Sequence, residues 1–141
     1  MIDEFIEIGE GVRFIPDQDQ HNVGAFGVTY EHHRSGIWTS FSGRHESSVP
    51  LEVEDERVQE LRQASGADLV NFERGRVKPY TVLNIAVGAD LLKEKRVTIS
   101  LQINTQNLTN KRFAYNFGRP FEGTYFGYSR LWSGRLKLTF K

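Results

Sequence analysis

Acidic and imidazole side chains alternate near the start of the chain in a way that suggests a cation site. Asp17, Asp19 and His21 are each two residues apart, so two carboxylates and one imidazole could meet at a metal ion. A calcium loop would also need a central glycine and a distant Glu, which do not follow. His32 and His33 are adjacent, and neighbouring side chains on a strand point to opposite sides, so they cannot converge on one ion. A solvated loop is the better interpretation of the first group, and a surface role is the better interpretation of the two histidines.

A second group of acidic residues could supply paired carboxylates for acid and base catalysis. It comprises Glu46, Glu52, Glu54, Asp55 and Glu56. No partner is fixed by their spacing, so we interpret them as a solvated acidic loop. The chain has no cysteine, which excludes a thiol nucleophile and a thiolate zinc site. We expect no catalytic residues, no metal and no cofactor, and therefore no enzyme.

Basic residues near the C-terminus could meet an anionic ligand through charge-assisted hydrogen bonds. They are Lys111, Arg112, Arg119 and Arg130. Positioning of a loop, or contact with the phosphates of lipopolysaccharide, is an equally good interpretation.

The segment Asn107-Leu108-Thr109 fits the acceptor pattern for N-glycosylation. The same Asn fits the exit of a strand, where its side chain can cap a turn. We favour the turn.

The strands that must position these residues are predicted from a repeat of two residues, in which apolar and polar side chains alternate. In Val97–Asn104 every second residue is apolar and the residues between are polar, which indicates a strand with one apolar and one polar face. Leu83–Leu91 and Leu136–Phe140 alternate in the same way. An antiparallel sheet is the first inference, and a membrane barrel is the leading form of it.

The alternation of apolar and polar residues, together with the turn-forming residues between the alternating segments, predicts five strands. They cover residues 22–33, 37–46, 80–92, 96–107 and 129–140. The first and third gaps are short enough for tight hairpins, while the second and fourth are long. Alternating short and long gaps are typical of an up-and-down sheet threaded through a membrane, with both long loops on one side. A soluble sandwich also mixes loop lengths.

A short helix over residues 55–64, stopped by Gly66, is expected in the first long gap. Val58 and Leu61 are its only apolar contacts, so we expect a minor loop feature.

The predicted last strand has two chemically distinct faces. Trp132, Gly134, Leu136, Leu138 and Phe140 share one face, and Tyr128 is expected on that face two steps earlier. The residues expected to face lipid on the other strands are Leu83, Ile85, Val87, Val97, Ile99, Leu101 and Ile103. The residues expected to line a polar lumen are Thr98, Ser100, Gln102, Asn104, Gln106, Ser133, Arg135, Lys137 and Thr139. The pattern leaves the facing of the strand that begins at Ile37 open.

Composition sets further limits. The 141 residues carry 18 basic and 18 acidic side chains without a basic cluster, so we expect no nucleic-acid partner. No uninterrupted apolar stretch of about 18–20 residues exists, which argues against a transmembrane helix. Met1–Glu7 is acidic and lacks the features of a secretory signal. If the barrel interpretation holds, we expect the chain to be the tail of a longer protein.

The last 45 residues are specific enough to suggest a family. An Asn-Leu turn leaves the penultimate strand, a loop with Asn-Phe and Gly-Thr elements follows, an Arg opens the last strand, and an aromatic residue closes it. These residues are Asn107, Leu108, Asn116, Phe117, Gly123, Thr124, Arg130 and Phe140. The pattern resembles the C-terminus of TonB-dependent outer-membrane receptors. The stretch from Phe14 to Asn22 is similar to the entry of a late strand in such barrels, whereas Lys141 after the aromatic departs from the family pattern.

The resemblance implies an all-β fold of about five antiparallel strands, forming part of a 22-stranded transmembrane barrel. It implies energy-coupled uptake of a scarce nutrient such as a siderophore by the whole receptor, of which the plug domain and most strands are absent from residues 1–141. Implied partners are outer-membrane lipid, the remaining barrel and plug, the TonB complex through that plug, and the barrel assembly machinery. Leu136, Leu138 and Phe140 would form the assembly signal.

Two other interpretations remain open. A soluble small β-barrel or sandwich could bury the apolar residues inside and bind a ligand there. A surface protein could pair its open sheet edges between copies.

Overall fold

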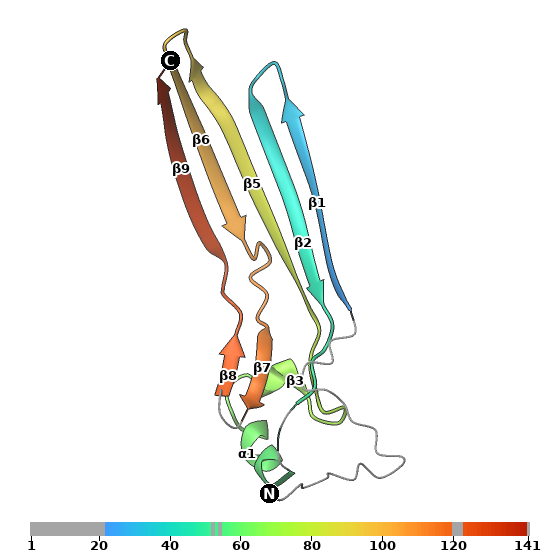
Figure 1. Ribbon diagram of the computed structural model, residues 1–141. Coiled ribbons are helices and arrows are strands. Elements are labelled where there is room, and N and C mark those ends of the chain that lie inside the picture. The colour runs from blue at the N-terminus through green and yellow to red at the C-terminus, as the bar shows by residue number, and fades with distance from the viewer. Residues whose placement is uncertain (1–21, 52, 54, 120–122, 141) are drawn as a thin grey trace, which may run out of the picture.

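The computed structural model describes residues 22–51, 53, 55–119 and 123–140. A long five-stranded sheet rises from a smaller group of short elements (Figure 1). The sheet strands are β1 (Val23–His32), β2 (Ile37–Glu46), β5 (Tyr80–Lys93), β6 (Val97–Gln106) and β9 (Leu131–Phe140). The short elements are η1 (Asp55–Arg57), α1 (Val58–Arg62), η2 (Ala67–Leu69), β3 (Val70–Asn71), β4 (Arg76–Val77), β7 (Ala114–Arg119) and β8 (Gly123–Phe126).

The sheet is an antiparallel meander in the order β1-β2-β5-β6-β9. All five predicted strands are confirmed, with bounds that agree to within two residues. The regular pairing is interrupted once, at a β-bulge between Asp90 and Leu92 in β5. A bulge places one extra residue on one strand, so the alternation that begins at Leu83 does not continue through Leu91.

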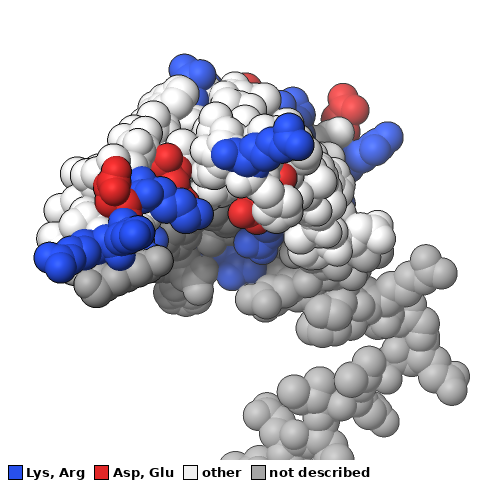
Figure 2. All heavy atoms as spheres, turned by 90° about the horizontal axis from the view of Figure 1, so that it is seen from above, with Lys and Arg blue, Asp and Glu red and all other residues white. Residues whose placement is uncertain are grey.

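Two short turns close one end of the sheet. In the β1–β2 turn the carbonyl of His32 accepts hydrogen bonds from the main-chain N–H groups of Ser35, at 3.2 Å, and Gly36, at 3.1 Å. Gly36 has a φ of 66°, a conformation that glycine adopts without steric cost. In the β5–β6 turn the N–H of Glu94 donates to the carbonyl of Val97 at 2.9 Å. Figure 2 looks onto this end and shows Lys and Arg side chains beside Asp and Glu side chains.

The register places most large apolar residues of the five strands on one side, here called the apolar face. Ile85 pairs with Phe41 of β2, which pairs with Val28 of β1; Ile85 also pairs with Thr105 of β6, which pairs with Trp132 of β9. The facing of β2, open in the sequence, is thereby settled. The apolar face comprises Phe26, Val28, Tyr30, Ile37, Thr39, Phe41, Leu83, Ile85, Val87, Ala89, Leu92, Val97, Ile99, Leu101, Ile103, Trp132, Leu136, Leu138 and Phe140.

Trp38 lies on the opposite, polar face and covers a glycine on the neighbouring strand. A Cβ added to Gly88 would meet the Trp38 ring at 2.5 Å. We expect Gly88→Ala to displace this ring and to lower the free energy of unfolding by about 1–3 kcal/mol, as overpacking does. Trp fluorescence during urea unfolding measures both effects. Gly134→Ala is the matched control, since its Cβ would meet nothing nearer than 4.0 Å, and an equal loss in both variants would contradict the prediction.

The two long connections meet at the other end of the sheet, as the sequence predicted (Figure 1). Their buried residues form one cluster, here called the loop core, which comprises Leu61, Val70, Val77, Ala114 and Phe117. Gly118 lies so close to Leu61 that an added Cβ would meet that side chain at 2.7 Å. The expectation of a minor loop feature was therefore wrong for the helix, because α1 supplies Leu61 to a core shared with the second connection.

Candidate functional site

The largest candidate interaction surface is the apolar face. Its large side chains are mostly exposed, including Val28 at 63%, Leu136 at 63% and Phe140 at 75%. Leu101 and Ile103 in the inner strand β6 are 37% and 48% exposed. Apolar patches that extend over several strands mark contact surfaces for a membrane or for another protein. The residues expected to face lipid all lie on this one face.

The opposite face carries a continuous set of polar contacts. Ser100 donates to the carboxylate of Asp90 at 2.7 Å, and the side-chain amide of Asn104 donates to Ser133 at 3.3 Å. The amide of Gln102 donates to Asn104. The residues expected to line a lumen share this face, since Asn104 pairs with Ser133 and Gln102 with Arg135.

Tyr128 does not lie where the sequence placed it. The residues from Gly127 to Arg130 are outside the strands, so the alternation of β9 does not extend back to Tyr128. Its side chain lines a hollow of about 360 Å³ together with polar-face residues such as Ser40 and Ser133. The expectation that Tyr128 shares the apolar face was therefore wrong.

Asn107, the residue after β6, forms hydrogen bonds that connect the end of β6 with the segment that precedes β9. Its side chain is fully buried, and its φ is 49°. The side-chain amide donates to the carbonyls of Lys111, at 2.9 Å, and Tyr128, at 2.8 Å, while its carbonyl oxygen accepts from the N–H of Lys111 at 2.8 Å. The next residue, Leu108, donates its N–H to the carbonyl of Leu83 at 2.7 Å. Asn107 therefore caps a turn, as we favoured, and its buried amide is closed to glycosylation.

The other residues of the family pattern also make structural contacts. The side-chain oxygen of Asn110 accepts from the N–H of Arg130 at 2.9 Å, and the guanidinium of Arg130 reaches the carbonyl of Leu108 at 3.5 Å. In the β7–β8 hairpin, Asn116 accepts from the N–H of Tyr125 at 2.8 Å and Thr124 accepts from the N–H of Gly118 at 3.0 Å.

Two further residues of the pattern belong to the same hairpin. Phe117 is 1% exposed in the loop core and packs edge-on against Phe72. Gly123 begins β8 with a φ of 75°. Together these contacts hold the second long connection in one shape.

An aromatic cluster joins the sheet to the loop core. Tyr80 stacks on Phe113 with ring centroids 4.2 Å apart, and Tyr115 packs edge-on against both rings. Glu46 pairs with Tyr80 in the register, is 6% exposed, and forms an ion pair with Arg44. The interpretation of Glu46 as a solvated loop residue was wrong, because it ends β2 beneath this cluster.

Burial raises the pKa of the Tyr80 phenol well above its usual range, and the nearby Glu46 carboxylate adds to the shift. Burial also raises the pKa of Tyr115, helped by Tyr128 and Glu46. Tyr80 precedes Leu83, the first apolar-face residue of β5, by three residues, and Tyr115 belongs to β7. Both phenols are therefore neutral at physiological pH and can donate hydrogen bonds.

Removal of the buried Tyr80 hydroxyl tests its surroundings. We expect Tyr80→Phe to raise the free energy of unfolding by about 1–3 kcal/mol, because the buried hydroxyl has no hydrogen-bond partner and its removal relieves the cost of burying an unpaired polar group. Urea unfolding of both proteins measures the change. The matched control is Tyr125→Phe, whose side chain is 53% exposed and whose change should be within about 0.5 kcal/mol. A Tyr80→Phe change as small as the control change would contradict a buried hydroxyl without a partner.

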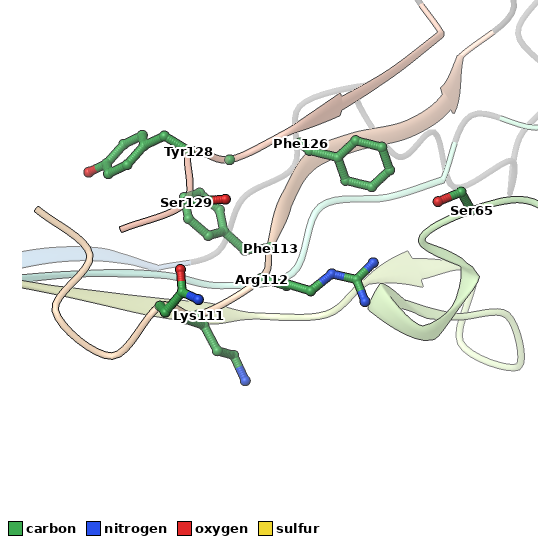
Figure 3. Close-up of a pocket in the computed structure, with 9 residues that line it drawn as sticks. Ser65, Lys111, Arg112, Phe113, Phe126, Tyr128 and Ser129 are labelled. Atoms are coloured by element: carbon green, nitrogen blue, oxygen red, sulfur yellow. The ribbon is translucent and has the colours of Figure 1, made fainter. Parts of the chain in front are cut away.

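The basic residues of the last loop do not converge on one anion site. Arg112 lies 3.7 Å from Asp68, and Arg130 is held by Leu108. A pocket of about 340 Å³ lies beside Arg112, between the turn after β6 and the segment after β8. Figure 3 shows Arg112 pointing towards Ser65, whereas Lys111 points away from the pocket.

The two histidines near the first turn have different partners and do not converge on one site. His32 contacts the hydroxyl of Ser35 at 2.8 Å, and His33 lies 3.7 Å from Glu31. In the part of the chain that the structure describes, no group of three or more His, Cys, Asp or Glu could hold a metal ion. Asp17, Asp19 and His21 lie outside the described residues, as do Glu52 and Glu54.

Among the described helices, none has the length and apolar character needed to cross a membrane. Comparison with known proteins yields no match for this chain among family models, curated proteins or solved structures.

Proposed function

We propose that the chain forms the C-terminal barrel wall of a TonB-dependent outer-membrane receptor, which takes up a scarce nutrient such as a siderophore by energy-coupled transport. The observation that carries the proposal is the exposed apolar face, continuous over five antiparallel strands and backed by a polar face. In a membrane barrel the first face meets lipid and the second lines the lumen.

The height of the apolar face fits a bilayer. Its paired rows run from Leu83 and its neighbours to Val97 and Phe140, which is about ten residue steps or roughly 33 Å along the strands. A strand tilt near 40° reduces this to about 25 Å. The apolar band of outer-membrane barrels is also about 25 Å tall.

Aromatic side chains mark the two ends of the band. Phe26, Phe41 and Trp132 lie in its two lowest rows, next to the long connections, and Phe26 and Phe41 pack with centroids 6.1 Å apart. Phe140 lies in the top row, next to the short turns. Aromatic girdles at both interfaces are typical of these barrels. The long connections would then lie outside the cell, and the short turns would face the periplasm.

The implied partners follow from the proposal. The remaining barrel and the plug would complete the receptor, the plug would contact the TonB complex, and the assembly machinery would recognise Leu136, Leu138 and Phe140. These three side chains lie on one face of β9, and each is more than half exposed.

The competing soluble barrel or sandwich would need the apolar face covered, by closure of the sheet around it or by a second layer. Cell fractionation decides between the two. An antibody against the last loop should detect, in the outer membrane, a protein several times larger than the 16.2 kDa of this chain. A soluble band of 16 kDa would overturn the receptor proposal and favour a small binding protein.

A further inference from the structure

The hollow beside Tyr128 on the polar face is lined by residues that carry no charge. Its volume is about 360 Å³, which falls within the range of roughly 300–1,000 Å³ that is typical of small-molecule sites. One row of the sheet crosses it, because Ala86 pairs with Ser40 on one side and with Asn104 on the other. The side chains that bring hydrogen-bonding groups to it from the strands include Ser40, Ser42, Asn84, Asn104, Gln106 and Ser133.

Several of these groups keep hydrogen-bonding capacity for a ligand. The side-chain oxygen of Asn84 accepts from the N–H of Asn107 at 3.0 Å, and the amide still has two N–H donors. The hydroxyl of Ser40 accepts from that of Thr29 at 3.1 Å and can donate its own proton. Ser42 pairs with Asn84 in the register and adds a further hydroxyl. The hollow therefore offers both donors and acceptors, all of them neutral.

The ring of Tyr128 supplies an aromatic wall to the hollow. Phe113 packs edge-on against it with ring centroids 6.0 Å apart, and Tyr128 is still 44% exposed. Figure 3 shows the Tyr128 ring pointing away from Phe126 and Ser65, which lie at the other end of the neighbouring pocket. A ring of this kind offers a ligand an apolar surface with a hydroxyl group at its tip.

We propose that this hollow is a binding site for a neutral saccharide. Each sugar hydroxyl both donates and accepts, which matches the serine hydroxyls and the side-chain amides of the lining. The C–H groups of a sugar ring can pack on the Tyr128 ring. An anionic ligand would find no cation among the lining residues. Arg44 lies beyond the hollow on β2, where it is ion-paired with Glu46.

The site is complete within this chain, so saccharide binding does not depend on the proposed function. In the proposed receptor the polar face would line the lumen, and the hollow would lie below the long connections. There, and resting on the proposed function, the inference names a neutral saccharide as the class of nutrient.

Saturation-transfer NMR titrations test the site on the protein purified from the cell fraction that contains it. The neutral probes are the methyl glycosides of glucose, galactose and mannose, together with maltose. The anionic probes are glucuronate and 2,3-dihydroxybenzoate. We expect at least one neutral saccharide to bind with a Kd of about 1 mM or lower. Both anions should bind at least tenfold more weakly, because the lining supplies no cation.

Variants locate the binding to the hollow. Ala86→Leu places a larger side chain in the middle of the row and should weaken binding of that saccharide at least tenfold. The matched control is Thr98→Leu, on the polar face of β6 but outside the lining, which should bind within about twofold of the unmutated protein. Tyr128→Ala removes the aromatic wall without adding bulk and should also cost at least tenfold, whereas Tyr128→Phe, which keeps the ring, should cost less. Because the two sites of substitution are independent, one of them decides if the other variant does not fold.

Three results would overturn the inference: no neutral probe with a Kd below about 10 mM, anions that bind as tightly as the best saccharide, or a loss in Ala86→Leu and Tyr128→Ala no greater than in Thr98→Leu. Fractionation remains a separate result. An outer-membrane protein that binds no saccharide would refute the site and leave the receptor proposal standing. A soluble protein that binds a neutral saccharide in the hollow would do the reverse.

Discussion

Lysine on the apolar face should abolish membrane insertion, while lysine one residue away should be tolerated. Leu101 and Ile103 lie near the middle rows of the apolar face, and Gln102 and Asn104 alternate with them on the polar face. A Lys facing lipid at the bilayer midplane costs about 2–4 kcal/mol. We expect Leu101→Lys with Ile103→Lys to lower the inserted fraction in vesicles of outer-membrane lipids by roughly a thousandfold or more, since the two costs add to about 4–8 kcal/mol and about 1.4 kcal/mol corresponds to a factor of ten.

The matched control is Gln102→Lys with Asn104→Lys, which should insert within a few-fold of the unmutated chain. An equal inserted fraction for the two double-lysine variants would contradict the assignment of the faces. A soluble fold that buried Leu101 and Ile103 would also be damaged by the first pair, so a second measurement is needed. The two tryptophans of the chain supply it, because Trp132 lies on the apolar face and Trp38 on the polar face. Brominated lipid should quench the fluorescence of the Trp38→Phe variant, which retains Trp132, and leave that of the Trp132→Phe variant largely unchanged.

The sheet could be predicted from the sequence because its strands and their pairing are determined by residues close together in the chain. Each strand alternates within itself, as Val97–Gln106 does, and the tight turns between β1 and β2 and between β5 and β6 fix the pairing of their neighbours. The bulge at Asp90 could not be placed, although the adjacent Leu91 and Leu92 break the alternation at that point. The facing of β2 was open because Trp38 is large and apolar but lies on the polar face, where Gly88 leaves room for its ring.

The loop end could not be predicted because its stability comes from contacts between distant segments. Leu61 and Phe117 share one core although more than 50 residues separate them. The strands β3 and β4 have two residues each and β8 has four, which is too short for a detectable period. Glu46 appeared to be one of several solvated acids, and only its pairing with Tyr80 shows why it is buried. The sequence pattern did single out Asn107, but not the carbonyl of Tyr128 that its amide binds.

Loss of the Asn107 side chain should open the second long connection without unfolding the sheet. Three hydrogen bonds join this side chain to the main chain of Lys111 and Tyr128, and each partner left unsatisfied costs about 1–3 kcal/mol. We expect Asn107→Ala to destabilise the connection by about 3–5 kcal/mol and to raise the rate of trypsin cleavage after Lys111 and Arg112 by at least a hundredfold. The rate follows the population of the opened state when closing is fast.

Two further variants separate the hydrogen bonds from the backbone conformation. Asn107→Gly loses the same three bonds but accepts the φ of 49° without steric cost, so it should lose about 1 kcal/mol less than Asn107→Ala. Thr109→Ala, at an exposed position of the same turn, should leave the cleavage rate within a few-fold of the unmutated chain. If Asn107→Gly restored full protection, the strain of the turn would account for the effect and the buried amide would not. If all three variants were cleaved at the rate of the unmutated chain, the Asn107 side chain would not hold the entry of β9 to the end of β6.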